Sequence, residues 1–468
     1  QRKLLLLLKS NPLTKEGLKA NSVSSQTIKV LIKNGWAAWQ LENPNVPPPF
    51  KVEKVDHGGI SLNSEQQRAI TSIKRETTYL LQGVTGSGKT EVYFRIIETI
   101  LKSRKQVLFL VPEIGLTPQA ILRFRARFGV KMAVLHSSLS DRERATGWLS
   151  AAEGSAGIIL GTRSAIFTPL AKLGLIIVDE EHDTSYKQQD GFRYSARDLS
   201  VLRGQFEKCI VILGSATPSL ESLRNVESRK YELLSLTKRA ANAKQEEYKL
   251  VDKRNIEIPD GFSKTVKQKI AKEINSGHQV LVFLNRRGFA PVMMCSTCNW
   301  IAQCTRCDAR LTYHLTQNKL ICHHCGLMHR DVTSCRSCGG QHLIAIGLGT
   351  QRVEQTLKAA FTGTPILRID RDSTIHRDTM TNFVEEVNKG LPAILVGTQL
   401  LAKGHHFPNV TLVVMLDIDA SFYSSDYRAL ERLGQLVLQV GGRAGRAEQR
   451  GTVIIQTEFA SHPLLKKL

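Results

Sequence analysis

Residues 83–90, with the sequence GVTGSGKT, have the types and spacing of a phosphate-binding loop. The loop follows the apolar stretch 79–81 and precedes a helical pattern over 91–101, which is the context that this motif requires. Backbone N–H groups of such a loop wrap phosphate oxygens, Lys89 reaches the β- and γ-phosphates, and the Thr90 hydroxyl ligates Mg²⁺. The residues predicted to bind the nucleotide are Gly83, Val84, Thr85, Gly86, Ser87, Gly88, Lys89 and Thr90. The alternative is a plain glycine turn between a strand and a helix.

Two carboxylates come directly after another apolar run. Asp179 and Glu180 follow residues 175–178, so they emerge at the carboxyl end of an expected buried strand, where open α/β sheets bind their ligands. Asp179 is predicted to hold the Mg²⁺ shell and Glu180 to polarise the attacking water. An acidic cluster alone is commonly a solvated turn, but together with the glycine loop it predicts an ATP hydrolysis site.

Two arginines lie near the end of the chain, Arg443 and Arg446, in the sequence QVGGRAGR over 439–446. At this spacing on a helix they face the same side. We predict that either one neutralises charge developing on the γ-phosphate, so that hydrolysis depends on two lobes closing around the nucleotide. The alternative is a basic surface turn.

Eight of the nine cysteines form four C-x-x-C pairs between residues 295 and 338. So many thiols in a short stretch favour metal binding over disulfides in a chain without secretory features. Zn²⁺ takes four thiolates in a closed tetrahedral site, so the sequence predicts two structural zinc ions and no catalytic one. Cys209, the remaining cysteine, is expected to be a core residue.

Three pairings of the four C-x-x-C pairs are possible. The alternation of Leu311, Tyr313 and Leu315, followed by a turn at 317–318, predicts a hairpin that brings the second and third pairs together. This nested arrangement assigns Cys304, Cys307, Cys322 and Cys325 to one ion, and Cys295, Cys298, Cys335 and Cys338 to the other. His323 and His324 are competing ligands.

Composition restricts the class of protein. With 42% hydrophobic and 23% charged residues, the 468-residue chain is neither disordered nor fibrous, and its length suits about two to four domains. A formal net charge of +22 points to a polyanionic partner such as nucleic acid. The apolar run near the start covers only residues 4–8, far below the roughly 20 residues of a membrane span, so we expect a cytoplasmic protein.

Short apolar runs alternate with helical patterns from about residue 60 onward, in two series. Such runs are typical of buried parallel strands, so the sequence predicts an α/β fold with two parallel-sheet lobes. The basic first 45 residues resemble a winged-helix module, although a helical packing unit without a DNA role fits equally well. The expected segments are a winged-helix-like module at 1–45, a linker at 46–59, an ATP-binding lobe at 60–235, the start of the second lobe at 236–290, a double-zinc insertion at 291–342 and the rest of the second lobe at 343–468.

Seven segments in order resemble the motifs of superfamily 2 helicases. They are 83–90, 111–117, 161–164, 179–182, 214–218, 397–404 and 439–446. The resemblance implies two RecA-like lobes, with segment 214–217 coupling hydrolysis to movement and Gln66 reading adenine. It also implies that one region of each lobe holds phosphates of one DNA strand. The residues expected there are Thr162, Arg163, Thr398 and Lys403.

A zinc insertion directly after the string NRRGF at 285–289 is not general to helicases. Together with GVT at 83–85, DEEHD at 179–183, YKQQ at 186–189 and QLLAKGHHFP at 399–408, it resembles the family of primosomal replication-restart helicases, PriA. The resemblance implies an ATP- and Mg²⁺-dependent enzyme that moves 3′ to 5′ on single-stranded DNA and recognises stalled or branched replication forks. It also implies single-stranded DNA-binding protein and other primosome proteins as partners.

Residues 183–198 resemble an aromatic-rich loop of that family, which senses single-stranded DNA and signals to the ATP site. Aromatic rings can stack on bases while basic side chains face phosphates. The residues assigned to these roles are Tyr186, Phe192 and Tyr194 for stacking, and Lys187, Arg193 and Arg197 for phosphates. The alternative is an ordinary loop of mixed composition.

Two other functions stay open from the sequence. One is a translocase that tracks along duplex DNA without separating its strands, and the other is a non-enzymatic scaffold that assembles primosome proteins through the zinc module. The family also carries an N-terminal domain that captures a 3′ end and a C-terminal domain after the second lobe. This sequence shows neither domain. If both are truly absent, recognition of the fork end is in doubt, while the motor is intact. The zinc module is expected to serve as a wedge or a docking surface.

Overall fold

The computed structural model describes residues 4, 5, 8, 18, 23–38, 50, 59, 61–74, 76–112, 118–239, 246–254, 256, 258, 261–285, 292–298, 300–307, 311–314, 319–322, 325–330, 334–346, 350–369, 383, 385–398, 407, 409–422, 424, 426–445 and 450–468. The chain divides into two compact units, Gln1–Pro49 and Phe50–Leu468. No helix among these described residues is both long and apolar enough to cross a bilayer.

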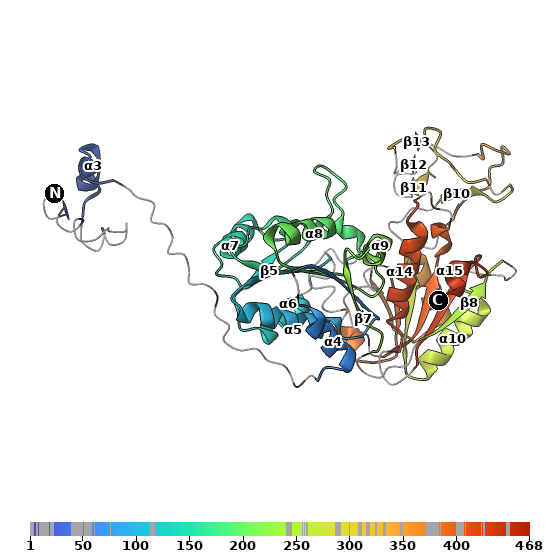
Figure 1. The fold of residues 1–468 in the computed structure, drawn as a ribbon. Helices are drawn as coiled ribbons and strands as arrows, with labels where there is room; N and C mark the ends of the chain where they lie inside the picture. Colours follow the sequence, from blue (N-terminus) through green and yellow to red (C-terminus); the bar gives the residue numbers. More distant parts are fainter. Residues whose placement is uncertain are drawn as a thin grey trace. The chain divides into compact units, whose positions relative to one another are not determined.

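The first lobe of the larger unit is built on a seven-stranded parallel sheet with the order β3-β4-β2-β5-β6-β1-β7 (Figure 1). Its strands are β1 (Thr78–Gly83), β2 (Gln106–Leu110), β3 (Met132–Leu135), β4 (Ile158–Gly161), β5 (Leu173–Asp179), β6 (Ile210–Ser215) and β7 (Glu232–Leu236). Alternate residues of β5 enter different core clusters, with Leu175 and Ile177 on one face and Ile176 and Val178 on the other. Burial on both faces explains why such strands are continuous apolar runs in the sequence.

Helices cover this sheet, and four of them are started by side-chain caps. They are α4 (Ser64–Ser72), α5 (Lys89–Lys102), α6 (Pro118–Arg127), α7 (Asp141–Ala152), α8 (Ala196–Glu207) and α9 (Leu220–Glu227), with the 3₁₀ turns η2 (Arg163–Phe167) and η3 (Thr184–Tyr186). Asn63 with Gln66 and Ser140 with Glu143 form capping boxes at α4 and α7. The capping serines 195 and 219 begin α8 and α9, which fixes where the preceding loops end.

The second lobe repeats this architecture with a six-stranded parallel sheet in the order β15-β16-β9-β17-β18-β8. Its strands are β8 (Glu247–Asp252), β9 (Gln279–Leu284), β15 (Ile366–Ile369), β16 (Ile394–Gly397), β17 (Val410–Leu416) and β18 (Thr452–Thr457). Its helices are α10 (Lys264–Asn275), α11 (Thr350–Ala360), α14 (Ala429–Gly441) and α15 (Pro463–Lys466), with the 3₁₀ turn η6 (Asp419–Ser421). The expected fold class of two RecA-like α/β lobes is confirmed.

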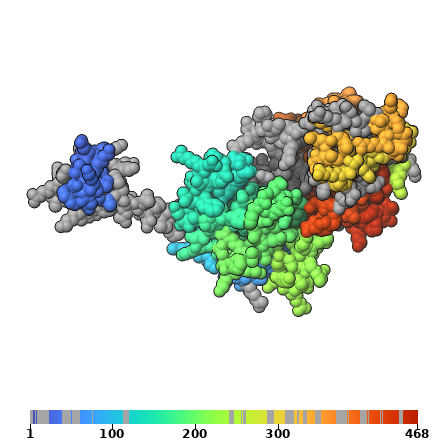
Figure 2. Space-filling model, turned by 90° about the horizontal axis from the view of Figure 1, so that it is seen from above, coloured from blue at the N-terminus to red at the C-terminus, as the bar shows by residue number. Residues whose placement is uncertain are grey.

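A Cys-rich module stands between β9 and α11. It is a five-stranded antiparallel sheet of β10 (Val292–Cys295), β11 (Thr312–His314), β12 (Lys319–Ile321), β13 (Met328–Arg330) and β14 (Leu343–Ile346). Since β14 pairs with β10, the module extends past the expected boundary at residue 342. It lies at one end of the second lobe above α14, and from above its yellow-orange surface covers part of the red residues (Figures 1 and 2).

The smaller unit has one described helix, α3 (Ser25–Lys33), capped by Ser24. Leu31 of this helix is buried with Leu4 and Leu18 in a small apolar cluster. A helix in this basic segment is compatible with both the winged-helix module and the helical packing unit. A winged-helix identity for the unit stays a prediction, because most of its residues, including the Pro-rich linker, lie outside the described part of the chain.

Candidate functional site

The phosphate loop joins the end of β1 to the start of α5, where Gly88 takes the N-cap position with φ +82°. Lys89 Nζ donates to the Gly83 carbonyl at 2.8 Å, so the ammonium lies inside the loop. A Cβ atom at Gly83 would come within 2.5 Å of Ser87 Oγ and 3.2 Å of Leu236 Cβ, so a larger residue would crowd the turn. Ser87 Oγ is buried without a hydrogen-bond partner among the described residues. An orphaned polar atom beside a helix N-terminus fits a phosphate ligand.

Gln66 supports the loop from α4. Its side chain is buried, and Nε2 donates to the Ser87 carbonyl at 2.9 Å while Oε1 accepts from Asn63 N at 2.9 Å. The carboxamide therefore positions the phosphate loop and closes the α4 cap. The adenine contact implied by the helicase resemblance stays a prediction.

Asp179 ends β5 and is held by a buried tyrosine. Tyr93, on α5, donates its hydroxyl to Asp179 Oδ1 at 3.0 Å. The hydroxyl passes over Gly214, where a Cβ atom would come within 1.6 Å of it, so this contact exists only because position 214 is glycine. Burial raises the pKa of Asp179 to about 6, and the neighbouring Glu180 adds to this effect, while Lys89 acts in the opposite direction. A cation beside a carboxyl group with a raised pKa favours its charged form, so Asp179 suits the role of a Mg²⁺ ligand.

Glu180 lies in the left-handed backbone region with φ +49°, an arrangement that concentrates at functional sites. Its Oε2 is buried and accepts no hydrogen bond from the described residues. His182 Nδ1 lies 3.8 Å from this oxygen. A carboxylate oxygen with free lone pairs next to the phosphate loop has the chemistry required to accept a proton from an attacking water.

His182 connects the lobes. Its Nδ1 lies 2.7 Å from Ser215 Oγ at the end of β6, and its Nε2 lies 2.6 Å from Gln439 Nε2 on α14. Ser215 Oγ also accepts from the Thr217 backbone N–H at 2.9 Å. The three segments 179–182, 214–217 and 439–446 are thereby joined by hydrogen bonds across the cleft.

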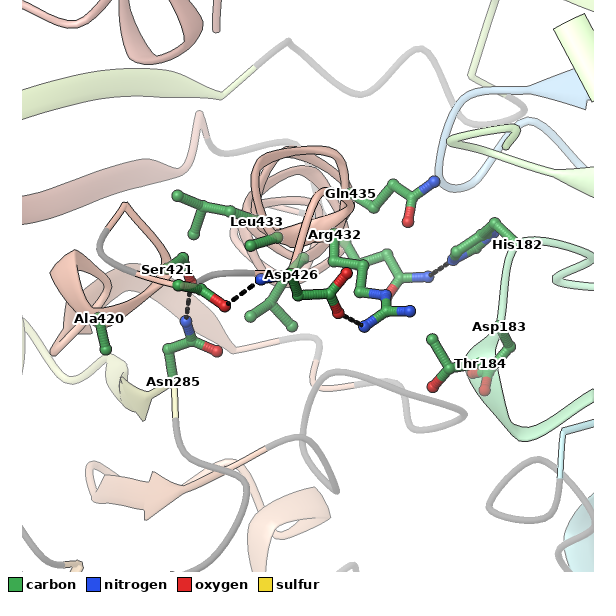
Figure 3. Close-up of a pocket in the computed structure, with 14 residues that line it drawn as sticks. His182, Asp183, Thr184, Asn285, Ala420, Ser421, Asp426, Arg432, Leu433 and Gln435 are labelled. Carbon is green, nitrogen blue, oxygen red and sulfur yellow. Dashed lines mark hydrogen bonds and ion pairs between the residues drawn. The ribbon is translucent and has the colours of Figure 1, made fainter. Parts of the chain in front are cut away.

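A pocket of about 280 Å³ opens beside this contact (Figure 3). His182 and Thr184 line it from the first lobe, and Asn285, Arg432 and Gln435 line it from the second. Figure 3 shows Asn285 reaching Ser421 and Arg432 reaching Asp426, so the polar groups of the second lobe are held in place by their own neighbours. The lobes therefore enclose a pocket in which polar side chains from both lobes lie beside apolar ones such as Leu433 and Leu436.

The arginine string reaches the phosphate loop through its glycines. A Cβ atom at Gly442 would lie 2.8 Å from Thr85 Oγ1, which places the C-terminal end of α14 directly against the loop. Arg443 follows immediately and is half-buried. Since Arg443 follows Gly442 directly, its backbone lies close to the loop, and its contact with the γ-phosphate stays a prediction. Arg446 lies outside the described residues.

Arg197 lies in a hydrogen-bond network inside the first lobe, which corrects the expectation that it contacts DNA phosphates. Its guanidinium donates to Glu181 Oε2 at 3.3 Å and to Ser219 Oγ at 2.7 Å, and it pairs with Asp198. Glu181 is almost fully buried and accepts further hydrogen bonds from Ser219 N and Ser222 Oγ. A buried carboxylate requires such a partner, so Arg197 is committed to an internal network.

Tyr186 is also corrected, because it cannot stack on a base in this structure. Only 2% of the residue is exposed, and its single O–H is shared between the carbonyls of Asp179, at 2.7 Å, and Leu110, at 3.0 Å. It is a core residue that anchors the start of the loop to the strand ends. Phe192 is 76% exposed, and Lys187 and Arg193 are exposed as well, so these three remain available to a ligand.

The remaining nucleic-acid candidates lie at strand ends. Thr162 follows β4 and is nearly buried, and Arg163 donates to the carbonyls of Ser185 and Lys187, which ties its segment to the loop. Thr398 follows β16 and is half-buried. Lys403 lies outside the described residues, as do the string 286–289 and His323 and His324. DNA contacts of these residues stay predictions.

The cysteines form two separate clusters in the nested pairing. Cys295, Cys298, Cys335 and Cys338 form one, and Cys304, Cys307, Cys322 and Cys325 the other, with the sulfur atoms of each within 4.8 Å of one another. Sulfur–sulfur distances of 3.5 to 3.6 Å fit a tetrahedral ion with Zn–S bonds of about 2.3 Å. The N–H groups of Arg306 and Ser337 donate to Cys304 and Cys335, which stabilises thiolates. Four thiolates leave no open coordination position, so both sites are structural. Cys209 is a core residue, as expected.

Three residues with evident roles were not singled out from the sequence. They are Tyr93, His182 and Gln439, which hold Asp179 and join the lobes. His182 and Gln439 lie within the helicase-like segments 179–182 and 439–446, and this position was the signal that could have identified them. Tyr93 had none, because an aromatic residue on an amphipathic helix is ordinarily a core residue.

Comparisons with known proteins agree with this geometry. Residues 63–226 match the DEAD/DEAH box helicase family, residues 304–330 match the PriA DNA helicase Cys-rich region domain, and residues 336–448 match the helicase conserved C-terminal domain. Solved structures with the same fold include the DUF1998 helicase MrfA bound to DNA, at 14% identity and a TM-score of 0.54 over 87% of this chain and 49% of that one. Another is the DEAD-box helicase Mss116, at 15% identity and a TM-score of 0.51 over 84% of this chain and 69% of that one.

Curated relatives match most of the chain. The replication restart protein PriA of Haemophilus influenzae is 50% identical over 412 residues, which is 87% of this chain and 56% of that protein. The PriA protein of Bacillus subtilis is 41% identical over 459 residues, or 95% of this chain and 56% of that protein. The chain therefore spans about half the length of these relatives.

Proposed function

Because this chain belongs to the family of PriA replication restart proteins, we propose that it is an ATP-dependent DNA helicase. The observation that carries the proposal is the approach of Gly442 to Thr85, since it brings the arginine string of one lobe against the phosphate loop of the other. An ATPase completed by its second lobe changes shape with each hydrolysis cycle, and a motor on a DNA strand requires this.

The finer proposal follows the family. The protein moves 3′ to 5′ on single-stranded DNA in the cytoplasm, recognises stalled or branched forks, and initiates primosome assembly for replication restart with single-stranded DNA-binding protein and other primosome proteins. A net charge of +22 supports a DNA partner. Mg²⁺ is proposed as the nucleotide's metal, held by Thr90 and Asp179.

The residues of the site have distinct tasks in this proposal. ATP and Mg²⁺ supply the phosphoanhydride and the cation that neutralises its oxygens. Lys89 exchanges the Gly83 carbonyl for a phosphate oxygen, and Glu180 accepts the proton of the attacking water at Oε2. Tyr93 keeps Asp179 oriented toward the loop. Arg443 approaches the γ-phosphate as α14 closes on Thr85. The hydrogen bonds of His182 to Gln439 and Ser215 couple this closure to the segment 214–217.

ATP hydrolysis measured with single-stranded, forked and duplex DNA tests the proposal. We expect strong stimulation by the first two and loss of turnover in Lys89→Ala. Strand displacement from substrates with a 3′ or a 5′ tail then tests unwinding and its direction. Hydrolysis that no DNA stimulates would end the DNA assignment. Stimulation without strand displacement would leave a translocase, and primosome assembly that survives in Lys89→Ala would favour a scaffold.

A further inference from the structure

An exposed aromatic cluster is assembled from two segments that are separate in the sequence. Phe192 and Tyr194 belong to the hairpin that stands out before α8 (Figure 1), which the bridge between Lys187 and Ser195 closes. The third ring is Phe167, at the end of η2. Its centroid lies 4.9 Å from that of Tyr194 and 6.4 Å from that of Phe192, and the two hairpin rings are 5.9 Å apart.

Phe167 is fixed by its backbone and not by burial of its ring. Its neighbours Ile166 and Thr168 are buried, and Arg203 of α8 donates to both of their carbonyls, at 2.7 and 2.9 Å. Arg163, at the start of the same turn, donates to the carbonyls of Ser185 and Lys187 and so fastens the turn to the hairpin. The segment that carries Phe167 is therefore held at both of its ends.

The ring of Phe167 nevertheless faces water, with 47% of the residue exposed. Together with Phe192 at 76%, it leaves a large apolar surface uncovered, and such surfaces commonly mark binding sites. An aromatic ring that merely covered Tyr194 would gain nothing from the rigid attachment. A ring held in advance in its binding position loses little conformational entropy when a flat ligand stacks on it.

The surroundings indicate the ligand. Arg193 and Lys187 are exposed on the same hairpin, and Thr162 precedes the turn. Aromatic rings beside basic side chains form the usual stacking surface for single-stranded nucleic acid. We propose that Phe167 is a DNA-binding residue, which stacks on a base of single-stranded DNA and completes a three-ring surface with Phe192 and Tyr194. This rests on the proposed function.

Equilibrium binding of two fluorescent oligonucleotides tests the proposal. One is an oligo-dT strand, and the other is an abasic strand of equal length, which keeps the phosphates but lacks the bases. We expect Phe167→Ala and Phe167→Leu to weaken oligo-dT binding by about tenfold and to leave binding of the abasic strand unchanged, since one stacked base is lost. Phe167→Tyr should bind as the unmodified protein does. Phe167→Leu keeps an apolar cover over Tyr194, so it separates loss of stacking from loss of packing.

Phe206→Ala is the matched control, because Phe206 on α8 is 77% exposed and does not belong to the cluster. It should bind both strands normally. If Phe167→Ala binds oligo-dT as tightly as Phe206→Ala does, or loses affinity for both strands equally, the stacking role is wrong while the helicase proposal stands. If the unmodified protein binds neither strand, both proposals fail.

Discussion

Gln439 Nε2 lies 2.6 Å from His182 Nε2, although the two residues belong to different lobes. An amide nitrogen only donates, so His182 Nε2 accepts, and the proton of the neutral ring resides on Nδ1, which donates to Ser215 Oγ at 2.7 Å. Ser215 begins the segment that leads into α9, and α9 itself contacts α14 through Glu431. The position of α14 is therefore coupled to the ATP site by hydrogen bonds.

Removing this contact should slow hydrolysis without preventing nucleotide binding. Gln439→Ala is expected to lower the DNA-stimulated kcat by about tenfold, because the lobes lose a coupling contact, with little change in ATP affinity. Leu438→Ala, at an exposed neighbouring position of α14, serves as the control and should behave normally. Equal kcat values for the two variants would show that the contact does not contribute to turnover.

Tyr93→Phe tests whether Asp179 must be held. The variant keeps the buried ring but removes the hydrogen bond to Asp179, so the carboxylate can rotate away from the loop. We expect kcat to fall by roughly ten- to a hundredfold, with a higher Mg²⁺ concentration needed for half-maximal rate, since hydrogen bonds to charged groups are among the stronger ones. Titrating Mg²⁺ at saturating ATP measures both effects. An unchanged Mg²⁺ dependence would contradict the orienting role.

Gly214→Ala probes the same contact from the other side. The new methyl group would overlap the Tyr93 hydroxyl, so we expect a loss of about 1–3 kcal/mol in the free energy of unfolding. Adding Tyr93→Phe removes the atom that clashes most and should restore part of this loss. Thermal unfolding of the two single variants and the double variant gives the comparison. Purely additive losses would mean that the tyrosine is not the obstacle.

Arg193 and Arg197 should respond differently to salt. Arg193 is exposed on the hairpin. Arg193→Ala should therefore remove one phosphate contact and make the slope of log affinity for single-stranded DNA against log salt shallower by about one. Arg197 pairs with Glu181 inside the lobe, so Arg197→Ala should leave that slope unchanged and destabilise the lobe by about 3–5 kcal/mol, because the buried carboxylate loses its partner. A reduced slope in Arg197→Ala would restore its assignment to phosphates.

Zinc content should follow the two clusters independently. The protein is expected to carry two Zn²⁺ ions, and Cys298→Ser and Cys307→Ser should each lose one, because the clusters share no ligand. Cys209→Ala is the control and should retain both. Emission spectrometry of the purified proteins measures this. A variant that loses both ions at once would show that the sites fold as one unit.

The sequence by itself determined the features that depend on local spacing. The phosphate loop, the carboxylates after β5 and the four C-x-x-C pairs each lie within a few residues, and buried central strands are readable as apolar runs. The edge strands β3 and β7 were not predicted from apolar runs. Only one face of each is covered, so buried and less buried residues alternate along these strands.

Only the tertiary structure decided which side chains meet. Tyr186 and Phe192 are aromatic residues of one loop, yet the fold buries Tyr186 under strand ends, where its hydroxyl bonds to a main-chain carbonyl, and leaves Phe192 exposed. Arg197 pairs with Glu181 because the Glu181 carboxylate is buried, and the sequence alone does not reveal that burial. Phe167 joins Tyr194 because η2, which follows β4, is fastened to the hairpin after β5 by Arg163, although β2 separates the two strands in the sheet.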